Sequence, residues 1–213
     1  MTDTVLSHST NLTFALLAGG QGRRVGYQNK GLIQWQERPL IRYTLDWLTH
    51  EIASLNGEVE ILLVTNDRKE DYQTLLTEYP HPVKLVSDRQ PGFLGPLAGM
   101  DTAFAHTQAD WIQCLPCDNP KIPPGLVARL QPFQNQSSII MPKDASRVQP
   151  LFSQIHRSVW PNMVAALAAN HLAVYKWMQT QDPYIANVSD LTTSFDNFNT
   201  FSLLNPLQNQ EPK

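Results

Sequence analysis

Short apolar runs and amphipathic stretches alternate along the first half of the chain. Runs with the length and composition of buried strands cover residues 12–17, 59–65, 83–86 and 111–115. Between them, apolar residues at helical spacing predict a helix over residues 39–52, and the mostly polar residues 68–79 also read as helical. Pro96 is well placed to open a third helix that runs to about residue 106. Regular alternation of strand and helix is typical of a parallel sheet whose faces are covered by helices. The pattern therefore predicts an α/β fold, with a single Rossmann-like domain and a mostly parallel central sheet.

The second half of the chain is less regular. Strand-like runs cover residues 137–141, 149–155 and 184–188. A helix is expected to begin at Pro123-Pro124, and residues 159–178 read as one or two helices with a break near Asn170. The chain of 213 residues suits one domain, which we place at residues 1–205. The polar residues 206–213 are expected to form a disordered tail.

Polar groups follow each predicted strand of the first half. A glycine-rich loop follows the first strand, Asn66 the second, Asp88 the third and Asp118 the fourth. In open α/β sheets, ligands bind beyond the carboxyl ends of the strands. Because the carboxyl ends of parallel strands meet at one edge of the sheet, we expect a ligand site along this edge.

The loop after the first strand, residues 16–32, reads LLAGGQGRRVGYQNKGL. Glycines let a backbone approach a ligand closely, and successive free N–H groups bind anions. Arg24 and Lys30 add full positive charges, so the loop predicts phosphate binding. It is not a Walker A loop, because no Ser or Thr follows the lysine. It is not a dinucleotide fingerprint either, because Val25 occupies the third glycine position.

Four charged residues are candidates for the chemistry of this site. Lys30 and Arg24 would bind a triphosphate and stabilise the leaving pyrophosphate, although solvated surface cations are the alternative interpretation. Asp118 is the candidate ligand of Mg²⁺, which takes few protein ligands; alternatively it is a turn residue that bonds its own backbone. Asp88 would accept a hydrogen bond from a nucleotide or help position the metal, or else serve as a loop acceptor.

Composition narrows the function classes. A net charge of −3 gives no electrostatic footprint for nucleic acid. No stretch reaches the ~18 apolar residues that a membrane span needs, and the polar start lacks a signal-peptide pattern, so we expect a cytoplasmic protein. Cys114 and Cys117 form a C-x-x-C pair, but no second pair of zinc ligands has suitable spacing. We expect both cysteines to be structural.

Five blocks of the sequence resemble, in order, those of the molybdenum cofactor guanylyltransferases, which are nucleotidyltransferases with a fold of the nucleotide-diphospho-sugar transferase type. The blocks are LLAGGQGRRVGYQNKGL, SDRQPGFLGPLAGM, LPCDNP with the following IPP, QPLF, and FDNFNT. The resemblance runs from about Leu12 to Asn205, which is nearly the whole chain. The GPLAG segment of the second block would either close over the nucleotide or serve only as a tight entry to a helix.

The resemblance implies roles for individual residues. The nucleotide would be bound by the backbone of the L-A-G-G segment and by later side chains, which here are Leu17, Ala18, Gly19, Gly20, Lys30, Asn66, Asp88 and Asp118. Asp118 would also hold Mg²⁺. The pterin side would involve the QPLF and NFNT segments, represented by Gln149, Pro150, Asn197 and Asn199.

The chain departs from the family pattern at three places. Asn29 stands where the family usually has Asp, and Tyr27 where it usually has Gly. Phe201 and Ser202 follow Thr200, where the family usually continues with Pro and acidic residues. These departures leave Lys30 and Asp118 unchanged.

The activity implied by the resemblance is transfer of GMP from GTP to the phosphate of molybdopterin or Mo-molybdopterin, with release of pyrophosphate. The acceptor phosphate is already ionised, so alignment of the two phosphates rather than a strong general base should carry much of the rate. The alternatives are a related enzyme that uses CTP or a sugar-phosphate acceptor, and a non-catalytic carrier of molybdenum cofactor. The expected protein partners are enzymes of molybdenum-cofactor biosynthesis and apo-molybdoenzymes.

Overall fold

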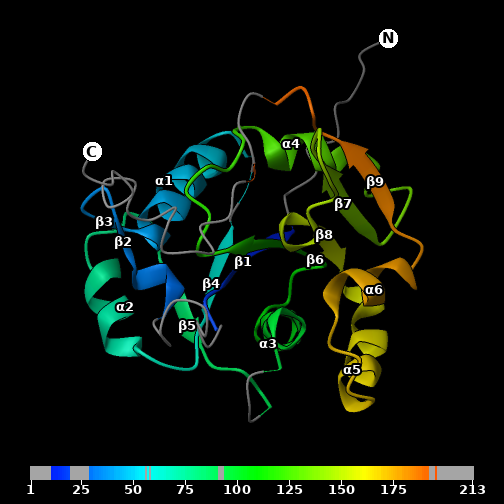
Figure 1. The fold of residues 1–213 in the computed structure, drawn as a ribbon, viewed down its shortest axis with the longest axis horizontal. Coiled ribbons are helices and arrows are strands. Elements are labelled where there is room, and N and C mark those ends of the chain that lie inside the picture. Colours follow the sequence, from blue (N-terminus) through cyan, green and yellow to red (C-terminus); the bar gives the residue numbers. More distant parts are fainter. Residues whose placement is uncertain are drawn as a thin grey trace, which may run out of the picture.

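The computed structural model describes residues 11–19, 29–55, 57, 59–90, 94–191 and 195. Within these ranges the chain forms one seven-stranded sheet with helices on both faces (Figure 1). The strand order is β5-β4-β1-β6-β8-β7-β9. The strands are β1 (Leu12–Leu17), β4 (Glu60–Val64), β5 (Lys84–Val86), β6 (Trp111–Pro116), β7 (Ile139–Lys143), β8 (Gln154–His156) and β9 (Tyr184–Asn187).

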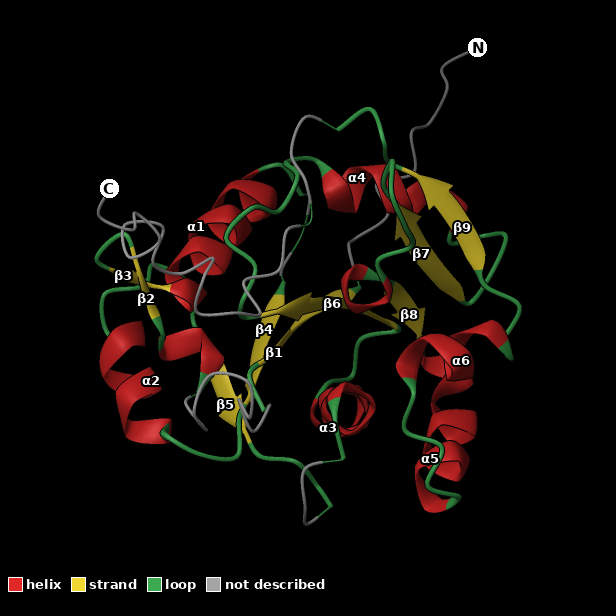
Figure 2. Ribbon diagram, in the orientation of Figure 1, coloured by secondary structure: helices red, strands yellow, loops and turns green. Residues whose placement is uncertain are grey.

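Helices and turns connect these strands (Figure 2). The α-helices are α1 (Leu40–Ala53), α2 (Lys69–Leu76), α3 (Pro96–His106), α4 (Leu126–Leu130), α5 (Trp160–Ala168) and α6 (Val174–Gln179). Short 3-10 helices are η2 (Lys30–Leu32), η3 (Gln131–Phe133), η4 (Pro150–Phe152) and η5 (Arg157–Val159). A small hairpin of β2 (Gln34–Trp35) and β3 (Arg38–Pro39) lies between η2 and α1.

The predicted parallel sheet of the first half is confirmed. β1 pairs in parallel with both β4 and β6, and β4 pairs in parallel with β5. In the second half, β8 runs antiparallel to both β6 and β7, whereas β9 runs parallel to β7. The sheet is therefore mostly parallel, as the sequence predicts, and the four strands of the first half end at the same edge.

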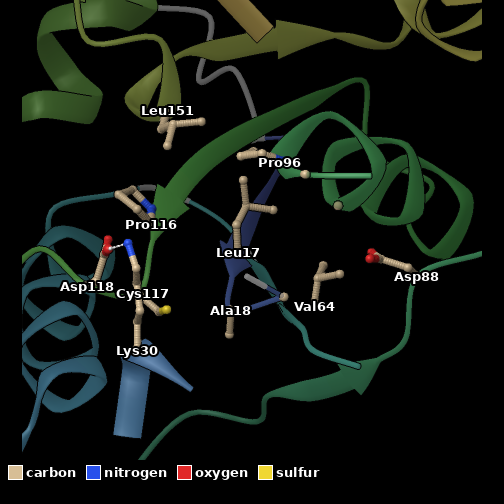
Figure 3. Close-up of a pocket in the computed structure, with 13 residues that line it drawn as sticks. Leu17, Ala18, Lys30, Val64, Asp88, Pro96, Pro116, Cys117, Asp118 and Leu151 are labelled. Carbon is tan, nitrogen blue, oxygen red and sulfur yellow. Dashed lines mark hydrogen bonds and ion pairs between the residues drawn. The ribbon is translucent and has the colours of Figure 1, made fainter. Parts of the chain in front are cut away.

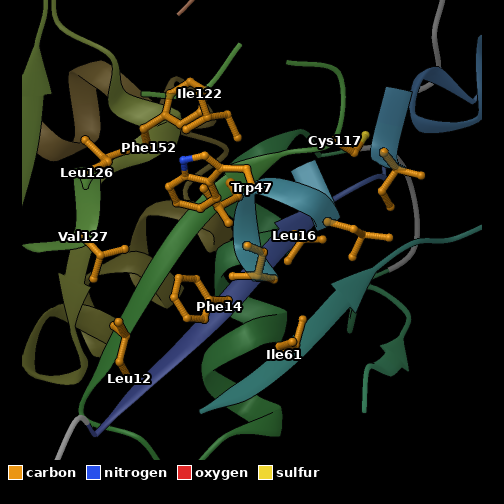
Figure 4. Close-up of a cluster of buried hydrophobic side chains, with 14 of the residues drawn as sticks. Leu12, Phe14, Leu16, Trp47, Ile61, Cys117, Ile122, Leu126, Val127 and Phe152 are labelled. Carbon is orange, nitrogen blue, oxygen red and sulfur yellow. The ribbon is translucent and has the colours of Figure 1, made fainter. Parts of the chain in front are cut away.

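Two hydrophobic clusters cover the two faces of the sheet, because successive side chains of a strand point to opposite faces. Leu12, Phe14 and Leu16 of β1 join the cluster beneath α1, α2 and α4 (Figure 4). Ala15 of β1 joins the cluster beneath α3, α5 and α6, which also includes Trp177. Burial on both faces explains why β1 reads as a continuous apolar run.

Two predicted elements are confirmed only in part, because the strand and the helix that form there both begin later than expected. The expected strand 149–155 is instead the 3-10 helix η4 followed by the short β8, because Pro150 fixes its own φ and has no N–H for a ladder. The helix expected at Pro123-Pro124 begins only at Leu126, after Gly125 at φ 75°. The Glu51 side chain from α1 accepts hydrogen bonds from the N–H groups of Gly125 and Val127 at this helix start.

The break predicted near Asn170 is confirmed. α5 ends at Ala168, α6 begins at Val174, and Asn170 lies between them at φ 59°. The expected tail, residues 206–213, lies outside the described residues. Among the helices that the structure describes, none has the length and apolar character required to cross a lipid bilayer.

Candidate functional site

A pocket lies at the edge of the sheet where the parallel strands end (Figure 3). The ends of β1, β4 and β6, the start of α3, and η2 and η4 all contribute to its wall. The lining residues are Leu17, Ala18, Gly19, Lys30, Val64, Asp88, Gly95, Pro96, Gly99, Pro116, Cys117, Asp118 and Leu151. The sequence predicted a site at this edge, and the structure brings six of its candidate residues into one pocket, namely Leu17, Ala18, Gly19, Lys30, Asp88 and Asp118.

An ion pair forms one side of the pocket. The Nζ atom of Lys30 lies 3.0 Å from Oδ2 of Asp118, and the two side chains are 25% and 11% exposed. Lys30 is the first residue of η2, and Asp118 comes two residues after the end of β6. The pair offers an ammonium group for phosphate oxygens and a carboxylate for a cation at the same point, which are the two groups that a metal-bound triphosphate requires.

A second carboxylate lies on the opposite side of the pocket, where Figure 3 shows Asp88. Its Oδ2 accepts a hydrogen bond of 2.7 Å from the Asn66 amide, and its own N–H donates to Asn66 Oδ1 at 2.8 Å. The Thr102 hydroxyl donates to Asp88 Oδ1 at 3.4 Å. Burial raises the pKa of Asp88, while the hydrogen bonds from Asn66 and Thr102 oppose that rise. Asn66 is therefore a partner of Asp88 rather than a lining residue.

The start of α3 forms another part of the wall. Gly95 has φ 82°, a left-handed value that favours glycine, and Pro96 follows at the first helical position. Among the residues that the structure describes, no side chain caps the helix start. A Cβ atom at Gly99 would lie 3.0 Å from Leu17 Cδ2, so the glycine lets α3 pack closely against the end of β1. Residues of the predicted GPLAG segment therefore shape the pocket.

The QPLF segment reaches the pocket through Leu151 rather than through the predicted residues. Gln149 is 5% exposed, and its amide donates to Asp144 Oδ2 at 2.7 Å. Burial of Asp144 would disfavour its charge, but hydrogen bonds from Arg147, Ser146 and Gln149 prevail and lower its pKa to about 2. Gln149 and Pro150 are absent from the described lining of the pocket.

Four predicted site residues lie outside the part of the chain that the structure describes. They are Gly20, Arg24, Asn197 and Asn199. Their roles stay predictions.

Both cysteines are free and buried, as expected for structural residues. Cys114 lies inside β6, and burial raises the pKa of its thiol. Cys117 follows the same strand, and burial likewise raises the pKa of its thiol, assisted by the Asp118 charge. Cys117 also lines the pocket, which the sequence interpretation missed.

A metal would have to rely on few protein ligands here. Within the described ranges, no group of three or more His, Cys, Asp or Glu side chains is placed to hold a metal ion. Asp118 supplies a hard oxygen donor beside the ammonium of Lys30. This donor set fits Mg²⁺ bound together with nucleotide phosphates, and it does not fit a closed structural metal site.

Sequence reasoning missed a network around the residue before Lys30. The Asn29 side chain contacts Tyr72 of α2 and Asp67 after β4 through hydrogen bonds of 2.5 Å and 2.7 Å. The sequence gave two signals, that Asn is a preferred residue at a helix N-cap and that Asn29 stands where the family usually has Asp. Its two long-range partners could not be predicted from that preference.

Comparison with known proteins adds sequence and fold relatives. The model of the MobA-like NTP transferase domain family matches residues 14–184. A molybdenum cofactor guanylyltransferase of Shewanella piezotolerans is 33% identical over 187 residues, which are 87% of this chain and 86% of the relative.

Two solved structures share the fold. One is the molybdopterin-guanine dinucleotide biosynthesis protein A of Archaeoglobus fulgidus, with a TM-score of 0.69 and 20% identity, covering 91% of this chain and 95% of that one. The other is a Mycobacterium tuberculosis protein in complex with manganese, with a TM-score of 0.61 and 16% identity, covering 84% and 89%.

Proposed function

Because this chain belongs to the molybdenum cofactor guanylyltransferases, with their MobA-like NTP transferase domain, we propose that it transfers GMP from GTP to the phosphate of molybdopterin, releasing pyrophosphate. The acceptor would be molybdopterin or Mo-molybdopterin. Family membership was predicted from the sequence blocks and is confirmed. The nucleotide, the acceptor and the individual residue roles belong to the proposal.

The observation that carries the proposal is the Lys30–Asp118 ion pair in the wall of the pocket, at the edge of the sheet where the parallel strands end. Transfer of a nucleotidyl group between two phosphates requires that charge on the leaving pyrophosphate be stabilised and that the reactants be aligned. Lys30 supplies the positive charge at the wall of the pocket, and Arg24 of the glycine loop would add a second one. Leu17, Ala18 and Gly19 line the same pocket as Lys30, and their backbone would hold the nucleotide beside the lysine.

Asp118 is the residue that would hold Mg²⁺. When bound, the metal supplies Lewis-acid stabilisation of phosphate oxygens. Lys30 could keep Asp118 as one partner and donate its other N–H groups to the triphosphate, since an ammonium has three donors. Asp118 would therefore both orient Lys30 and provide the hard oxygen ligand.

The opposite wall suits the nucleoside. Asp88 is half-buried and held by Asn66, so its carboxylate is oriented before any ligand arrives. A carboxylate accepts hydrogen bonds from the N–H groups of a guanine edge or from ribose hydroxyls. Asp88, held in place by Asn66, is the side chain that would distinguish GTP from other nucleotides.

The pterin would enter beside η4, whose Leu151 lines the pocket. In this proposal Gln149 and Pro150 shape that turn, while Asn197 and Asn199 contact the pterin from the late segment. The product would pass to apo-molybdoenzymes, and its precursor would come from proteins that synthesise molybdenum cofactor.

The test is release of pyrophosphate from each of the four ribonucleoside triphosphates, measured with purified protein, Mg²⁺ and molybdopterin. GTP should give turnover that depends on both metal and acceptor, and Asp118→Ala should remove it. Preference for CTP would overturn the choice of base. Turnover with a sugar phosphate in place of molybdopterin would overturn the choice of acceptor. Pterin binding without release of pyrophosphate would identify a carrier instead of an enzyme.

A further inference from the structure

Asn29, the residue before Lys30, makes hydrogen bonds within the protein through both the oxygen and the nitrogen of its side-chain amide. Asn29 is 7% exposed. Its Nδ2 donates to Asp67 Oδ1 at 2.7 Å and to the Ala18 carbonyl oxygen at 3.4 Å. Its Oδ1 accepts from the Tyr72 hydroxyl at 2.5 Å and from the Gly31 N–H at 3.2 Å. An Asn side chain has two donor hydrogens and two acceptor lone pairs, so this set satisfies the amide completely.

The partners of Asn29 belong to separate parts of the fold. Ala18 follows β1, Asp67 follows β4, Tyr72 lies in α2 and Gly31 lies in η2 directly after Lys30. One side chain thus connects two strand ends and a helix to the turn that carries the pocket lysine. Because Asn29 and Gly31 flank Lys30, a displacement of the Asn29 side chain would move the lysine backbone as well.

The tyrosine fixes which way the amide points. Tyr72 is fully buried, and burial is the main reason that its pKa is raised, so the phenol keeps its proton. Its hydroxyl therefore donates to Asn29 Oδ1. With the oxygen turned toward Tyr72, Nδ2 is directed to the carboxylate of Asp67. Asp67 is exposed to solvent, but a residue without a donor at position 29 could not replace this direct hydrogen bond to it.

A carboxylate at position 29 would have a different effect from the amide. It could still accept from Tyr72 and Gly31, but it would lie about as close to Asp67 as the present 2.7 Å contact. Two carboxylates at that separation repel, and one of them must take up a proton or move away. An amide at one position and a carboxylate at the other is the arrangement that satisfies both groups.

We propose that Asn29 is a positioning residue that holds Lys30 against Asp118, and that Asn29 and Asp67 act as a matched amide–carboxylate pair. The inference rests on the proposed function for its kinetic readout. Neither side chain is among the described residues that line the pocket. Both act through the backbone of η2, which sets the direction from which Lys30 reaches Asp118.

Exchange of the two groups tests the pair. Asn29→Asp should lower kcat for pyrophosphate release about 10-fold or more, because the lysine loses its orientation, with a smaller change in KM for GTP. Asp67→Asn keeps an acceptor for Asn29 and should lower kcat less. The double variant Asn29→Asp, Asp67→Asn restores one amide and one carboxylate, and its kcat should recover to within about 3-fold of the parent protein.

Two further variants serve as controls. Asn162→Asp adds the same charge at an exposed position of α5, where the Asn162 amide donates to Gln181. It separates the effect of net charge from the effect of the Asn29–Asp67 pair. Tyr72→Phe removes only the hydroxyl and should lower kcat by about 3- to 10-fold while the protein stays folded. It keeps the test informative if Asn29→Asp does not fold. A folded double variant no more active than Asn29→Asp, or an unchanged Tyr72→Phe enzyme, would overturn the proposal.

A structural readout separates this inference from the proposed function. Lysines labelled with ¹³C-dimethyl groups give one signal each, and Lys30→Arg identifies the signal of Lys30. That signal should shift in Asn29→Asp and return in the double variant, whatever reaction the protein catalyses. A parent protein that releases no pyrophosphate but shows this shift and return would refute the function and leave the positioning role in place. Absence of both shift and return would refute the positioning role.

Discussion

Lys30 and Asp118 are 88 positions apart in the sequence, and their side chains meet at 3.0 Å on the wall of a single pocket. Lys30 comes from the loop after β1 and Asp118 from the loop after β6, and these two strands are neighbours in the sheet. The pairing of β1 with β6 therefore creates the site, because it places two oppositely charged groups at the same edge.

Removal of either member of this pair should abolish most of the activity. Lys30→Ala and Asp118→Ala should each reduce kcat/KM for GTP by about 100-fold or more, since each removes an interaction with the charged phosphates. Pyrophosphate release measures the activity, and thermal unfolding shows whether the fold is retained. Arg38→Ala is a matched control, because it breaks the exposed Arg38–Asp46 ion pair away from the pocket. Turnover near the parent level in either pocket variant would contradict the assigned role.

The partner of Asp88 should control the acid side of the pH profile. The hydrogen bond from Asn66 lowers the pKa of Asp88 against the raising effect of burial. Asn66→Ala removes that bond, so the pKa should rise and the carboxylate should protonate at higher pH. If ionised Asp88 binds the nucleotide, the acidic limb of kcat/KM for GTP moves to higher pH. An unshifted limb would mean that Asp88 does not have to be ionised for nucleotide binding.

Glu51 should stabilise the start of α4. Its carboxylate accepts hydrogen bonds from the N–H groups of Gly125 and Val127 at 2.5 Å and 3.2 Å. Glu51→Ala leaves both groups without this partner and should lower the free energy of unfolding by about 1–3 kcal/mol. Urea unfolding of the two proteins measures the difference, and Glu78→Ala, on an exposed side chain, is the control.

Glu51 should also make the free energy of unfolding fall as the pH rises. Burial raises the pKa of Glu51 in the folded protein above the ordinary value of 4.5. The folded state thus binds the proton more readily than the unfolded state, so this contribution is fully present below that ordinary pKa. It is lost as pH rises through the folded pKa. The Glu51→Gln variant should lack this decline, and an identical pH dependence in both proteins would contradict it.

Gly31 should tolerate no side chain while Tyr72 is present. A Cβ atom there would lie 2.5 Å from the Tyr72 hydroxyl oxygen and 3.2 Å from Cys117 Sγ. Gly31→Ala should lower the free energy of unfolding by about 1–3 kcal/mol through overpacking. Adding Tyr72→Phe removes the closest atom, so the double variant should be more stable than the sum of the single changes implies. Chemical unfolding of the four proteins gives the coupling directly, and strict additivity would contradict a steric clash.

Much of the first half of the fold was determined by local sequence. The apolar run of β1, the proline that opens α3 and the residues that follow the strands are local signals, and the structure places them as expected. Parallel pairing then brings Asp88 and Asp118 to one edge without further information. The sequence could therefore indicate both the α/β class and the location of the site.

The second half shows where local signals fail. The run 149–155 has strand-like residues, yet Pro150 has no N–H for the ladder and Gln113 takes the carbonyl of Phe152 with its side chain. The residues after Pro123 become helical only where Glu51, 74 positions before Gly125, supplies the missing hydrogen-bond acceptor. Hydrogen bonds to residues far away in the sequence decide the secondary structure of such segments. A local sequence pattern does not reveal those residues.

The sequence by itself determined which residue types stand after each strand and hence the kind of ligand that they suit. Only the tertiary structure decided how those residues are held: Asp88 by Asn66, and Lys30 by Asp118 and, through its neighbour Asn29, by Asp67 and Tyr72. The physical reason is that hydrogen bonds and ion pairs depend on distances of about 3 Å between side chains, which strand order and helix packing set across many intervening residues.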